Sequence, residues 1–261
     1  MNFSLYIAKR YLFSKSNNNA INIITGIASL GIIVGTLALF VVMSVFSGLK
    51  VFSLSFSNDF DPDLKVFPAK GKTINISHTQ ENQLRNVKDI AVFSKVTEER
   101  VLFYFKGKEL VTYLKGVDAK FTKTNVVSKN LFNGEWLATK TPEVVVGYGI
   151  SEKLSLGLFD FNNPFEVYVP RKGKAIIESE AEAFSRAKLV PIGIYAISED
   201  LDSKYVFCDL ELAQKLLEYK PNEVSAIEIK MKTAADEEKV IESIHSIFKN
   251  NVIVKNRSQQ N

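Results

Sequence analysis

The chain has 261 residues, of which 46% are hydrophobic and 24% are charged, and its formal net charge is +4. This composition is that of a globular protein, and because basic and acidic side chains alternate from residue 59 onward, no basic stripe predicts a nucleic-acid partner. The single cysteine, Cys208, excludes an internal disulfide and a zinc site built from cysteines. We interpret Cys208 as a small buried residue of a strand.

The first predicted element is a short helix within residues 1–20. Phe3, Ile7 and Tyr11 recur at helical spacing on one face, and two basic residues lie off that face. This pattern is typical of a helix that lies in the membrane interface, although a plain charged flank would have the same composition. We predict a cytoplasmic interfacial helix here.

A transmembrane helix is predicted over residues 21–49. Residues 27–46 carry no charge, and a helix of that length extends about 30 Å, the thickness of the hydrocarbon core of a bilayer. A secretory signal has a shorter apolar core of about 7–15 residues, and a buried helix of a soluble protein normally carries a polar stripe. Three basic residues precede the run, and the first acidic residue, Asp59, follows it. The positive-inside rule therefore places the N-terminus in the cytoplasm and the chain after about residue 50 outside the inner membrane.

Gly31 and Gly35 stand four residues apart within the span. This spacing allows two membrane helices to approach closely, and it also occurs by chance in apolar helices. We name both glycines as candidate helix-packing residues.

Beyond the span, strands and helices alternate. The first part is predicted to contain a strand, a helix and two strands joined by a turn at 106–108, within residues 63–69, 79–87 and 90–118. The middle part is predicted to contain a strand that leads into a helix and two further strands, within residues 142–158, 164–170 and 189–197. The last part is predicted to alternate strand and helix over residues 203–209, 210–219, 224–231, 236–250 and 251–256. Pro191 is expected to mark a turn or a strand end.

These elements predict an α+β fold outside the membrane, divided into three parts. Two α/β halves, residues 50–118 and 204–261, flank an inserted and mostly β subdomain over residues 119–203. The roughly 210 residues after the span are enough for one sizeable core or two small ones.

No sequence motif predicts a catalytic site. The fragment "KGKT" at residues 70–73 is similar to the end of a phosphate-binding loop, but Val66 stands where that loop needs a glycine. His78 and His245 are not paired at the spacing of metal ligands. The carboxylates of residues 97–100 are expected on a solvated hairpin. We therefore predict no enzyme activity, no metal and no cofactor for this chain.

Three motifs, in this order, resemble those of one permease family. The segment from Tyr6 to Lys50 is similar to the beginning of the permease subunits of lipoprotein-releasing ABC transporters, the LolC/LolE type within the MacB and FtsX-like permease family. "VVVGYGISEKLSLGL" at residues 144–158 resembles a signature of the family's external domain. "DSKYVFCDLELAQKLL" at residues 202–217 resembles its closing strand and helix. The resemblance covers nearly the whole chain.

The resemblance implies a periplasmic domain with a porter-like α/β part and an inserted β-rich part. It also implies four membrane spans, three of them after the external domain, so we expect this sequence to be a truncated permease. The implied partners are a separate cytoplasmic ATPase subunit, a second permease subunit in a homodimer or heterodimer, and a lipoprotein cargo. The expected location is the inner membrane of a bacterium.

In such permeases, ATP hydrolysis closes the periplasmic domains and pushes a lipid-anchored cargo out of the outer leaflet. An acyl anchor held by about 0.8 kcal/mol per buried CH₂ needs an apolar surface and coupled work to leave the membrane. The resemblance assigns lipoprotein contact to Val42, Val45 and Phe46, with Leu39 as a helical neighbour. The alternative is that these side chains face bulk lipid.

In the LolC branch of the family, a loop between two strands of the external domain docks the periplasmic chaperone that receives the lipoprotein. The corresponding segment here is Pro170–Lys188, where Arg171, Lys172 and Lys174 would supply basic contacts. The alternative is an ordinary solvated loop.

Two other functions stay open. One is a MacB/FtsX-like efflux or signalling permease, which a fused ATPase or an adaptor gene would favour. The other is a singly anchored periplasmic binding or sensor domain, which a native reading frame ending at Asn261 would favour. A neighbouring gene for a free-standing ATPase, together with a lipoprotein-chaperone gene, would favour lipoprotein release.

Overall fold

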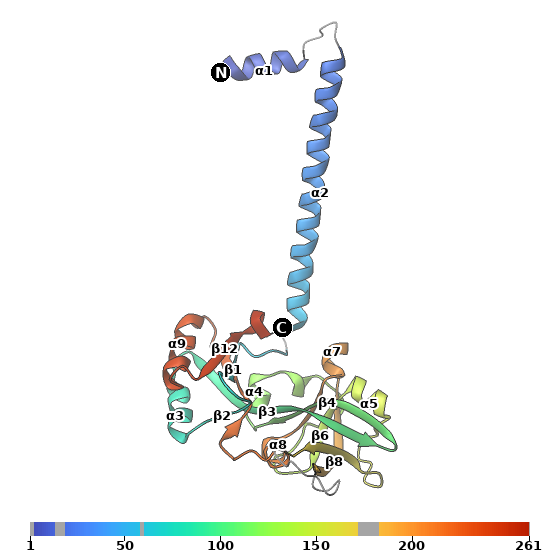
Figure 1. The fold of residues 1–261 in the computed structure, drawn as a ribbon, viewed down its shortest axis with the longest axis vertical. Coiled ribbons are helices and arrows are strands. Elements are labelled where there is room, and N and C mark those ends of the chain that lie inside the picture. The colour runs from blue at the N-terminus through green and yellow to red at the C-terminus, as the bar shows by residue number, and fades with distance from the viewer. Residues whose placement is uncertain (1–2, 14–18, 58–59, 172–182, 261) are drawn as a thin grey trace. The chain divides into compact units, whose positions relative to one another are not determined.

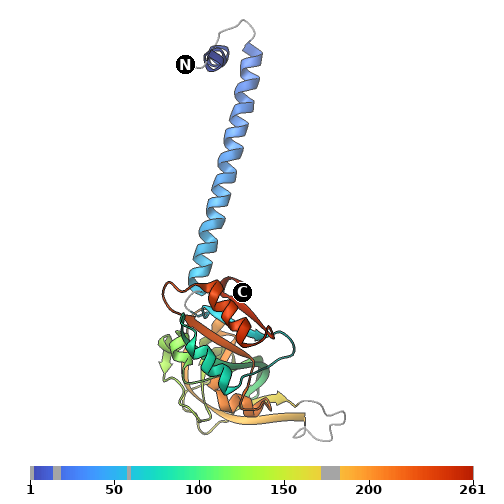
Figure 2. The same ribbon diagram turned by 90° about the vertical axis from the view of Figure 1, so that its left-hand side faces the viewer.

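The computed structural model describes residues 3–13, 19–57, 60–171 and 183–260. The chain forms two compact units, Met1–Ser55 and Phe56–Asn261, and each is described by itself. We call the second unit the α/β domain. Figures 1 and 2 show the ribbon from two sides.

Two helices begin the chain. α1 spans Phe3–Phe13, and α2 spans Asn19–Ser57, a run of 39 residues. Within α2, Ile23–Leu49 is long and apolar enough to cross a membrane, with a mean hydropathy of 2.4 and no buried residue. The Thr36 hydroxyl donates to the Ile32 carbonyl at 2.7 Å, so this polar group is satisfied within the helix. The predicted apolar helix is confirmed, as part of a longer one.

A ten-stranded sheet forms the centre of the α/β domain. Its order is β12-β1-β11-β3-β4-β9-β6-β8-β5, and β7 pairs with both β3 and β8. The parallel pairs are β4 with β9 and β6 with β8, and the other pairs are antiparallel. The strands are β1 (Leu64–Pro68), β3 (Ile90–Phe105), β4 (Lys108–Val117), β5 (Leu131–Gly134), β6 (Glu143–Gly147), β7 (Phe165–Pro170), β8 (Phe184–Tyr195), β9 (Tyr205–Asp209), β11 (Ala226–Met231) and β12 (Val252–Asn256).

Short elements connect and cover this sheet. A separate two-stranded sheet pairs β2 (Ile74–Asn75) with β10 (Glu223–Val224). The helices are α3 (His78–Asn86), α4 (Phe121–Thr124), the 3₁₀ helix η1 (Val127–Lys129), α5 (Tyr148–Leu154), α7 (Glu199–Asp202), α8 (Leu210–Leu216), α9 (Glu237–Ile247) and α10 (Arg257–Gln260). The mixture of helices and strands confirms the predicted α+β class.

The long strands β3 and β4 form a hairpin in the middle of the sheet, with β11 on one side and β9 on the other. Lys106 and Gly107 have φ angles of 47° and 82°, as a two-residue type I′ turn requires, which confirms the predicted turn. The first half of β3 pairs with β11, and its second half pairs with β7. One sheet therefore runs across the expected internal boundaries at residues 119 and 204, and those boundaries stay a prediction.

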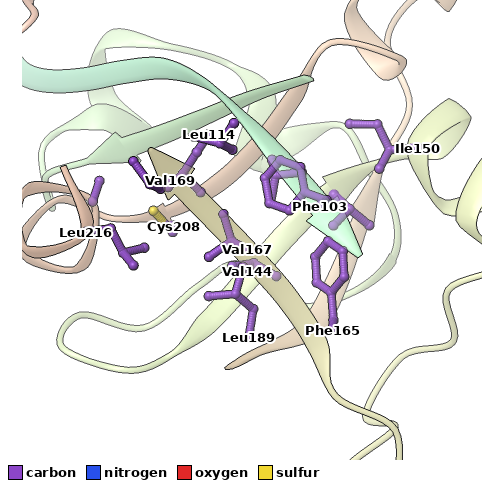
Figure 3. Packing of buried hydrophobic residues seen from close by; sticks show 14 of the residues in the cluster. Phe103, Leu114, Val144, Ile150, Phe165, Val167, Val169, Leu189, Cys208 and Leu216 are labelled. Atoms are coloured by element: carbon purple, nitrogen blue, oxygen red, sulfur yellow. The ribbon is translucent and has the colours of Figure 1, made fainter. Parts of the chain in front are cut away.

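Buried apolar side chains pack against this sheet in several clusters. One cluster packs α3 and α9 against β1 and β11, with Leu84 and Ile244 at its centre. A second cluster packs α5 and α8 against the β-rich strands, and Phe103 stacks on Phe165 with ring centroids 5.3 Å apart (Figure 3). Cys208 lies within this second cluster, which confirms its interpretation as a buried strand residue.

The polar segment expected from Pro170 to Lys188 is shorter than predicted. β8 already begins at Phe184, which pairs with Pro170 of β7, and the ladder continues through Lys188. The physical reason is a cross-strand aromatic pair, since the rings of Tyr168 and Phe184 meet edge to face with centroids 6.3 Å apart. Only residues 171–183 lie between the two strands.

Contrary to the expectation of a turn or a strand end, Pro191 lies inside β8. It pairs with Val144 of β6 directly beside a register shift in this ladder. A proline lacks the backbone N–H that a regular ladder uses, and such an irregularity tolerates the loss.

Close packing explains two glycines of the 144–158 segment, Gly147 and Gly149. A Cβ atom at Gly147 would lie 2.1 Å from the Asp202 carbonyl oxygen, and one at Gly149 would lie 2.5 Å from Ser203 Oγ. The junction of β6 and α5 therefore lies so close to the end of α7 that only glycine, which has no side chain, fits at these two positions.

We expect Gly147→Ala to lower the free energy of unfolding by about 1–3 kcal/mol, because the backbone of Asp202 must move to admit a methyl group. Gly157→Ala is the matched control from the same segment, since a Cβ atom there would meet nothing within 4 Å. We expect that control to change the same free energy by less than about 0.5 kcal/mol. Thermal unfolding of the detergent-solubilised chain, followed by circular dichroism, measures both. Equal midpoints for the two variants would contradict the close approach.

Candidate functional site

The side chains that the family resemblance assigns to lipoprotein contact all lie in the continuous helix α2, at Leu39, Val42, Val45 and Phe46. Their side chains are 50–68% exposed in the isolated chain. Val42 and Phe46 are four residues apart and Leu39 precedes Val42 by three, so these three share one face, and Val45 lies at its flank. The result is an apolar surface that no described side chain covers.

Gly31 and Gly35 lie on the same face of α2 as Val42. Gly35 precedes Val42 by seven residues and Gly31 precedes it by eleven, and both separations are close to whole turns of a helix. A Cβ atom at either glycine would meet nothing within 4 Å among the described residues. This face is therefore smooth at the glycines and bulky at Val42 and Phe46. The helix-packing role of the glycines stays a prediction.

The segment that the family resemblance assigns to chaperone docking lies between β7 and β8. Pro170 is the last residue of β7, and the Arg171 amide donates to the Ala183 carbonyl at 2.9 Å, which closes the root of the hairpin. Lys172 and Lys174 lie outside the described residues. The docking role of these four residues stays a prediction.

A groove of about 390 Å³ lies at the root of this hairpin. Arg171, Arg186 and Lys215 line it together with one acidic residue, Glu218. Arg171 Nε lies 3.8 Å from Glu218 Oε1, so one of the three cations is already partly compensated. The excess of positive charge favours an acidic partner surface here.

The described residues contain no group of three or more His, Cys, Asp or Glu side chains that could hold a metal ion. Lys72 of the "KGKT" fragment donates to Glu99 at 2.8 Å. Burial raises the pKa of the Cys208 thiol, so the thiolate needed for nucleophilic chemistry does not form at neutral pH.

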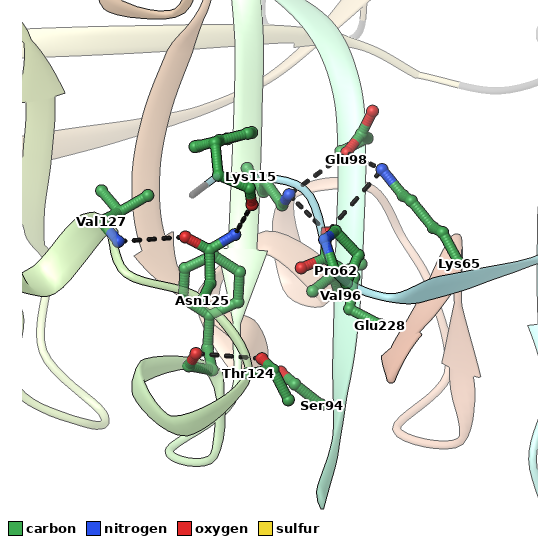
Figure 4. Close-up of polar contacts among 12 residues, drawn as sticks. Pro62, Lys65, Ser94, Val96, Glu98, Lys115, Thr124, Asn125, Val127 and Glu228 are labelled. Atoms are coloured by element: carbon green, nitrogen blue, oxygen red, sulfur yellow. Dashed lines mark hydrogen bonds and ion pairs between the residues drawn. The ribbon is translucent and has the colours of Figure 1, made fainter. Parts of the chain in front are cut away.

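A buried cluster of four charges, which the sequence did not predict, lies at the centre of the sheet (Figure 4). Lys115 Nζ lies 2.6 Å from Glu228 Oε1, and both side chains are 1% exposed. Lys65 Nζ lies 3.2 Å from Glu98 Oε2, and 3.8 Å separates each lysine from the other carboxylate. The expectation that all carboxylates of residues 97–100 are solvated is therefore wrong for Glu98, because two lysines draw it into the sheet.

The ion pairs decide the charge states of this cluster. Burial alone would lower the pKa of Lys115, but the carboxylates of Glu228 and Glu98 outweigh burial and raise it. Burial alone would raise the pKa of Glu98, but the ammonium groups of Lys65 and Lys115 outweigh burial and lower it. Both side chains are therefore ionised across the physiological pH range.

Aromatic rings surround the ammonium group of Lys115. Its Nζ lies 5.2–6.0 Å from the ring centroids of Phe60, Phe121, Tyr205 and Phe207. The faces of aromatic rings attract a cation, so this cage adds to the attraction of the carboxylates. Phe60 is the first residue described after α2, so the cage reaches the beginning of the α/β domain.

Residues 60–65, the first that the structure describes after α2, are called the leading segment below. The Asn125 side-chain amide donates to the Phe60 carbonyl, and the Phe60 ring stacks on Tyr205 with centroids 5.8 Å apart. Asp63 forms an ion pair with Arg257 of α10 at 2.7 Å and accepts a hydrogen bond from the Met231 amide of β11 at 2.6 Å. The leading segment is therefore fixed to several elements that are distant in the sequence.

Comparisons of sequence point to membrane permeases. A model of the MacB-like periplasmic core domain family matches residues 25–247. The lipoprotein-releasing system transmembrane protein LolC of Haemophilus influenzae is 50% identical over 52 residues. That match covers 19% of this chain and 13% of the LolC protein, so the chain matches only a small part of that relative.

Comparisons of structure agree on the fold. The periplasmic region of MacB from Actinobacillus actinomycetemcomitans superposes with a TM-score of 0.53 and 12% identity, over 77% of this chain and 92% of that one. The extracellular domain of the noncanonic ABC-type transporter YknZ from Gram-positive bacteria superposes with a TM-score of 0.52 and 11% identity, over 74% of this chain and 99% of that one. At these identities, the likeness is one of fold alone.

Proposed function

The chain belongs to the family of MacB-like periplasmic core domains, and we propose that within it the chain is a permease subunit of an ABC transporter that extracts lipoproteins from the inner membrane. The family implies an ATPase partner and paired permeases. In the proposed cycle, ATP hydrolysis in the cytoplasm moves the α/β domain outside the membrane, and that movement expels the cargo. The chain itself is proposed to perform no catalysis.

The observation that carries the proposal is the 50% identity over 52 residues with LolC, a transmembrane protein of a lipoprotein-releasing system. The uncovered apolar face of α2 at Leu39, Val42 and Phe46 supports it, because an acyl anchor leaving a bilayer needs an apolar surface to contact. The basic groove at the root of the β7–β8 hairpin supports a periplasmic partner such as a lipoprotein chaperone.

The test reconstitutes the complete permease with its ATPase and permease partners in vesicles that carry an acylated lipoprotein. We expect ATP to release the lipoprotein into the aqueous phase when an acceptor chaperone is present. A non-acylated form of the same protein, attached through a transmembrane helix, is the control and should stay in the membrane. Equal retention of both forms, with ATP hydrolysed normally, would contradict lipoprotein release.

A second candidate is an efflux or signalling permease, which the match to the MacB-like periplasmic core domain family supports equally well. The same vesicles distinguish it. ATP-dependent movement of soluble small molecules, or activation of a cell-wall hydrolase, without lipoprotein release would favour this candidate.

The proposed topology places the α/β domain outside the cytoplasm and α1 inside it. We expect a membrane-impermeant maleimide to label Glu109→Cys in sealed cells, because Glu109 is exposed on β4. Lys9→Cys, exposed on α1, should react only after the membrane is made permeable. The native Cys208 gives little background, because it is fully buried. Labelling of Lys9→Cys in sealed cells would contradict the topology.

A further inference from the structure

The leading segment follows α2 almost directly. α2 ends at Ser57, and only residues 58 and 59 precede Phe60. Any force that passes along the chain from α2 to the sheet must therefore pass through residues 60–65. The contacts of this short segment decide which parts of the domain such a force would move.

Three side chains of the leading segment meet the buried charge cluster. The Phe60 ring lies 5.5 Å from Lys115 Nζ, and Lys65 Nζ lies 3.2 Å from Glu98 and 3.8 Å from Glu228. The Asp61 carboxylate adds to the negative potential at Lys115. These contacts come from β3, β4 and β11, which are neighbours in the middle of the sheet. Figure 4 shows Lys65, Glu98, Lys115 and Glu228 converging from separate strands.

The stability of the domain alone does not explain why a buried ion pair occupies the positions of Lys115 and Glu228. A buried ion pair loses its hydration, and apolar residues of similar volume often stabilise a domain equally well. Glu228 Oε2 is also buried without a hydrogen-bond partner among the described residues, so the pair is not even fully satisfied. Charged contacts of this kind do fix one geometry, because any sliding of the strands separates opposite charges in a dry environment.

We propose that Lys115 and Glu228 are coupling residues, which fix the leading segment to the middle of the sheet so that a displacement of α2 moves the sheet as one body. The inference rests on the proposed function, in which movement of the membrane helices drives the domain outside. Strand β3 would carry the displacement farther through the sheet, because it pairs with β11 beside the cluster and with β7 farther along. The residues position the segment and take no part in any chemical step.

The test uses the double variant Lys115→Met, Glu228→Gln in the complete transporter. Removing both members leaves Lys65 and Glu98 as a neutral pair, so no uncompensated charge stays buried and the domain should fold. The matched control is Thr112→Val on the same strand, because Thr112 is also buried but its hydroxyl donates to the backbone carbonyls of Ser203 and Lys204 and not to a charged group. A second variant, Phe60→Leu, weakens the same coupling from the other side without changing a charge.

The first readout is the change in amide hydrogen exchange of β3, β4 and β11 when ATP is added. We expect this change to fall at least fivefold in the double variant and by a smaller factor in Phe60→Leu, with the ATPase rate within twofold of the wild type. Thr112→Val should respond like the wild type. An undiminished ATP response in the double variant would overturn the proposal.

The second readout is lipoprotein release, which separates this inference from the proposed function. Release that falls at least tenfold in the double variant, with ATP hydrolysis retained, supports the coupling role. If the wild type releases no lipoprotein, the proposed function fails, and the exchange readout alone still decides on the coupling residues. If the double variant loses its ATP response but releases lipoprotein normally, coupling through these residues is not part of transport and the proposal is overturned.

Discussion

Lys115→Met as a single substitution is expected to lower the free energy of unfolding of the α/β domain by about 3–5 kcal/mol. The methionine removes the ammonium group that lies 2.6 Å from Glu228 and leaves that carboxylate buried. Lys65 is its only other cationic partner among the described ion pairs, at 3.8 Å. An uncompensated carboxylate in the interior is costly, and only protonation or a local opening of the sheet relieves it.

Comparing Lys115→Met with the double variant Lys115→Met, Glu228→Gln shows whether the uncompensated charge causes the loss of stability. Adding Glu228→Gln removes the uncompensated carboxylate, so we expect most of the lost stability to return although a second residue has changed. Urea unfolding of the detergent-solubilised chains, followed by tryptophan fluorescence, measures both free energies. If the double variant is less stable than Lys115→Met by a further increment, then volume and packing dominate at this site, and the charge-based explanation fails.

Local sequence patterns were sufficient to predict most individual helices and strands. The alternating segment of residues 90–118 with its Lys-Gly turn predicted the β3–β4 hairpin, because the two turn residues need positive φ angles. The amphipathic segment of residues 236–250 predicted α9, whose Val240 and Ile244 are buried. The apolar run of residues 27–46 predicted the long helix α2.

Relations between distant segments could not be predicted in the same way. The pairing of β9 with β4 and β6 depends on strands about 60–90 residues earlier, and no local pattern encodes it. The signal for the charge cluster was present, since Lys65, Lys115 and Glu228 each stand between apolar or small neighbours in a strand. Each charge alone resembles an ordinary solvated residue. Only the strand order brings two lysines and two glutamates together.

Replacing Phe46 or Val42 by aspartate is expected to impair lipoprotein release by the complete transporter at least tenfold. A carboxylate near the end of a span meets apolar helices or acyl chains at a cost of about 1–3 kcal/mol, and about 1.4 kcal/mol corresponds to a factor of ten. Membrane insertion and binding of the ATPase subunit should persist, because this part of α2 lies away from the bilayer centre. Release assays and co-purification measure the two properties separately.

Phe40 is the control that shows whether cargo contact depends on one face of α2 or only on an apolar side chain in that helix. It is 72% exposed, compared with 68% for Phe46, but a separation of six residues turns it about 120° around the helix. A photo-crosslinker at Phe46 should capture lipoprotein, and one at Phe40, or at Ile33 nearer the middle of the span, should capture less. Equal capture at the three positions, or normal release by both aspartate variants, would show that α2 only anchors the domain. Selective capture at Phe46 would instead identify the face shared by Leu39, Val42 and Phe46 as the surface on which the acyl chains leave the bilayer.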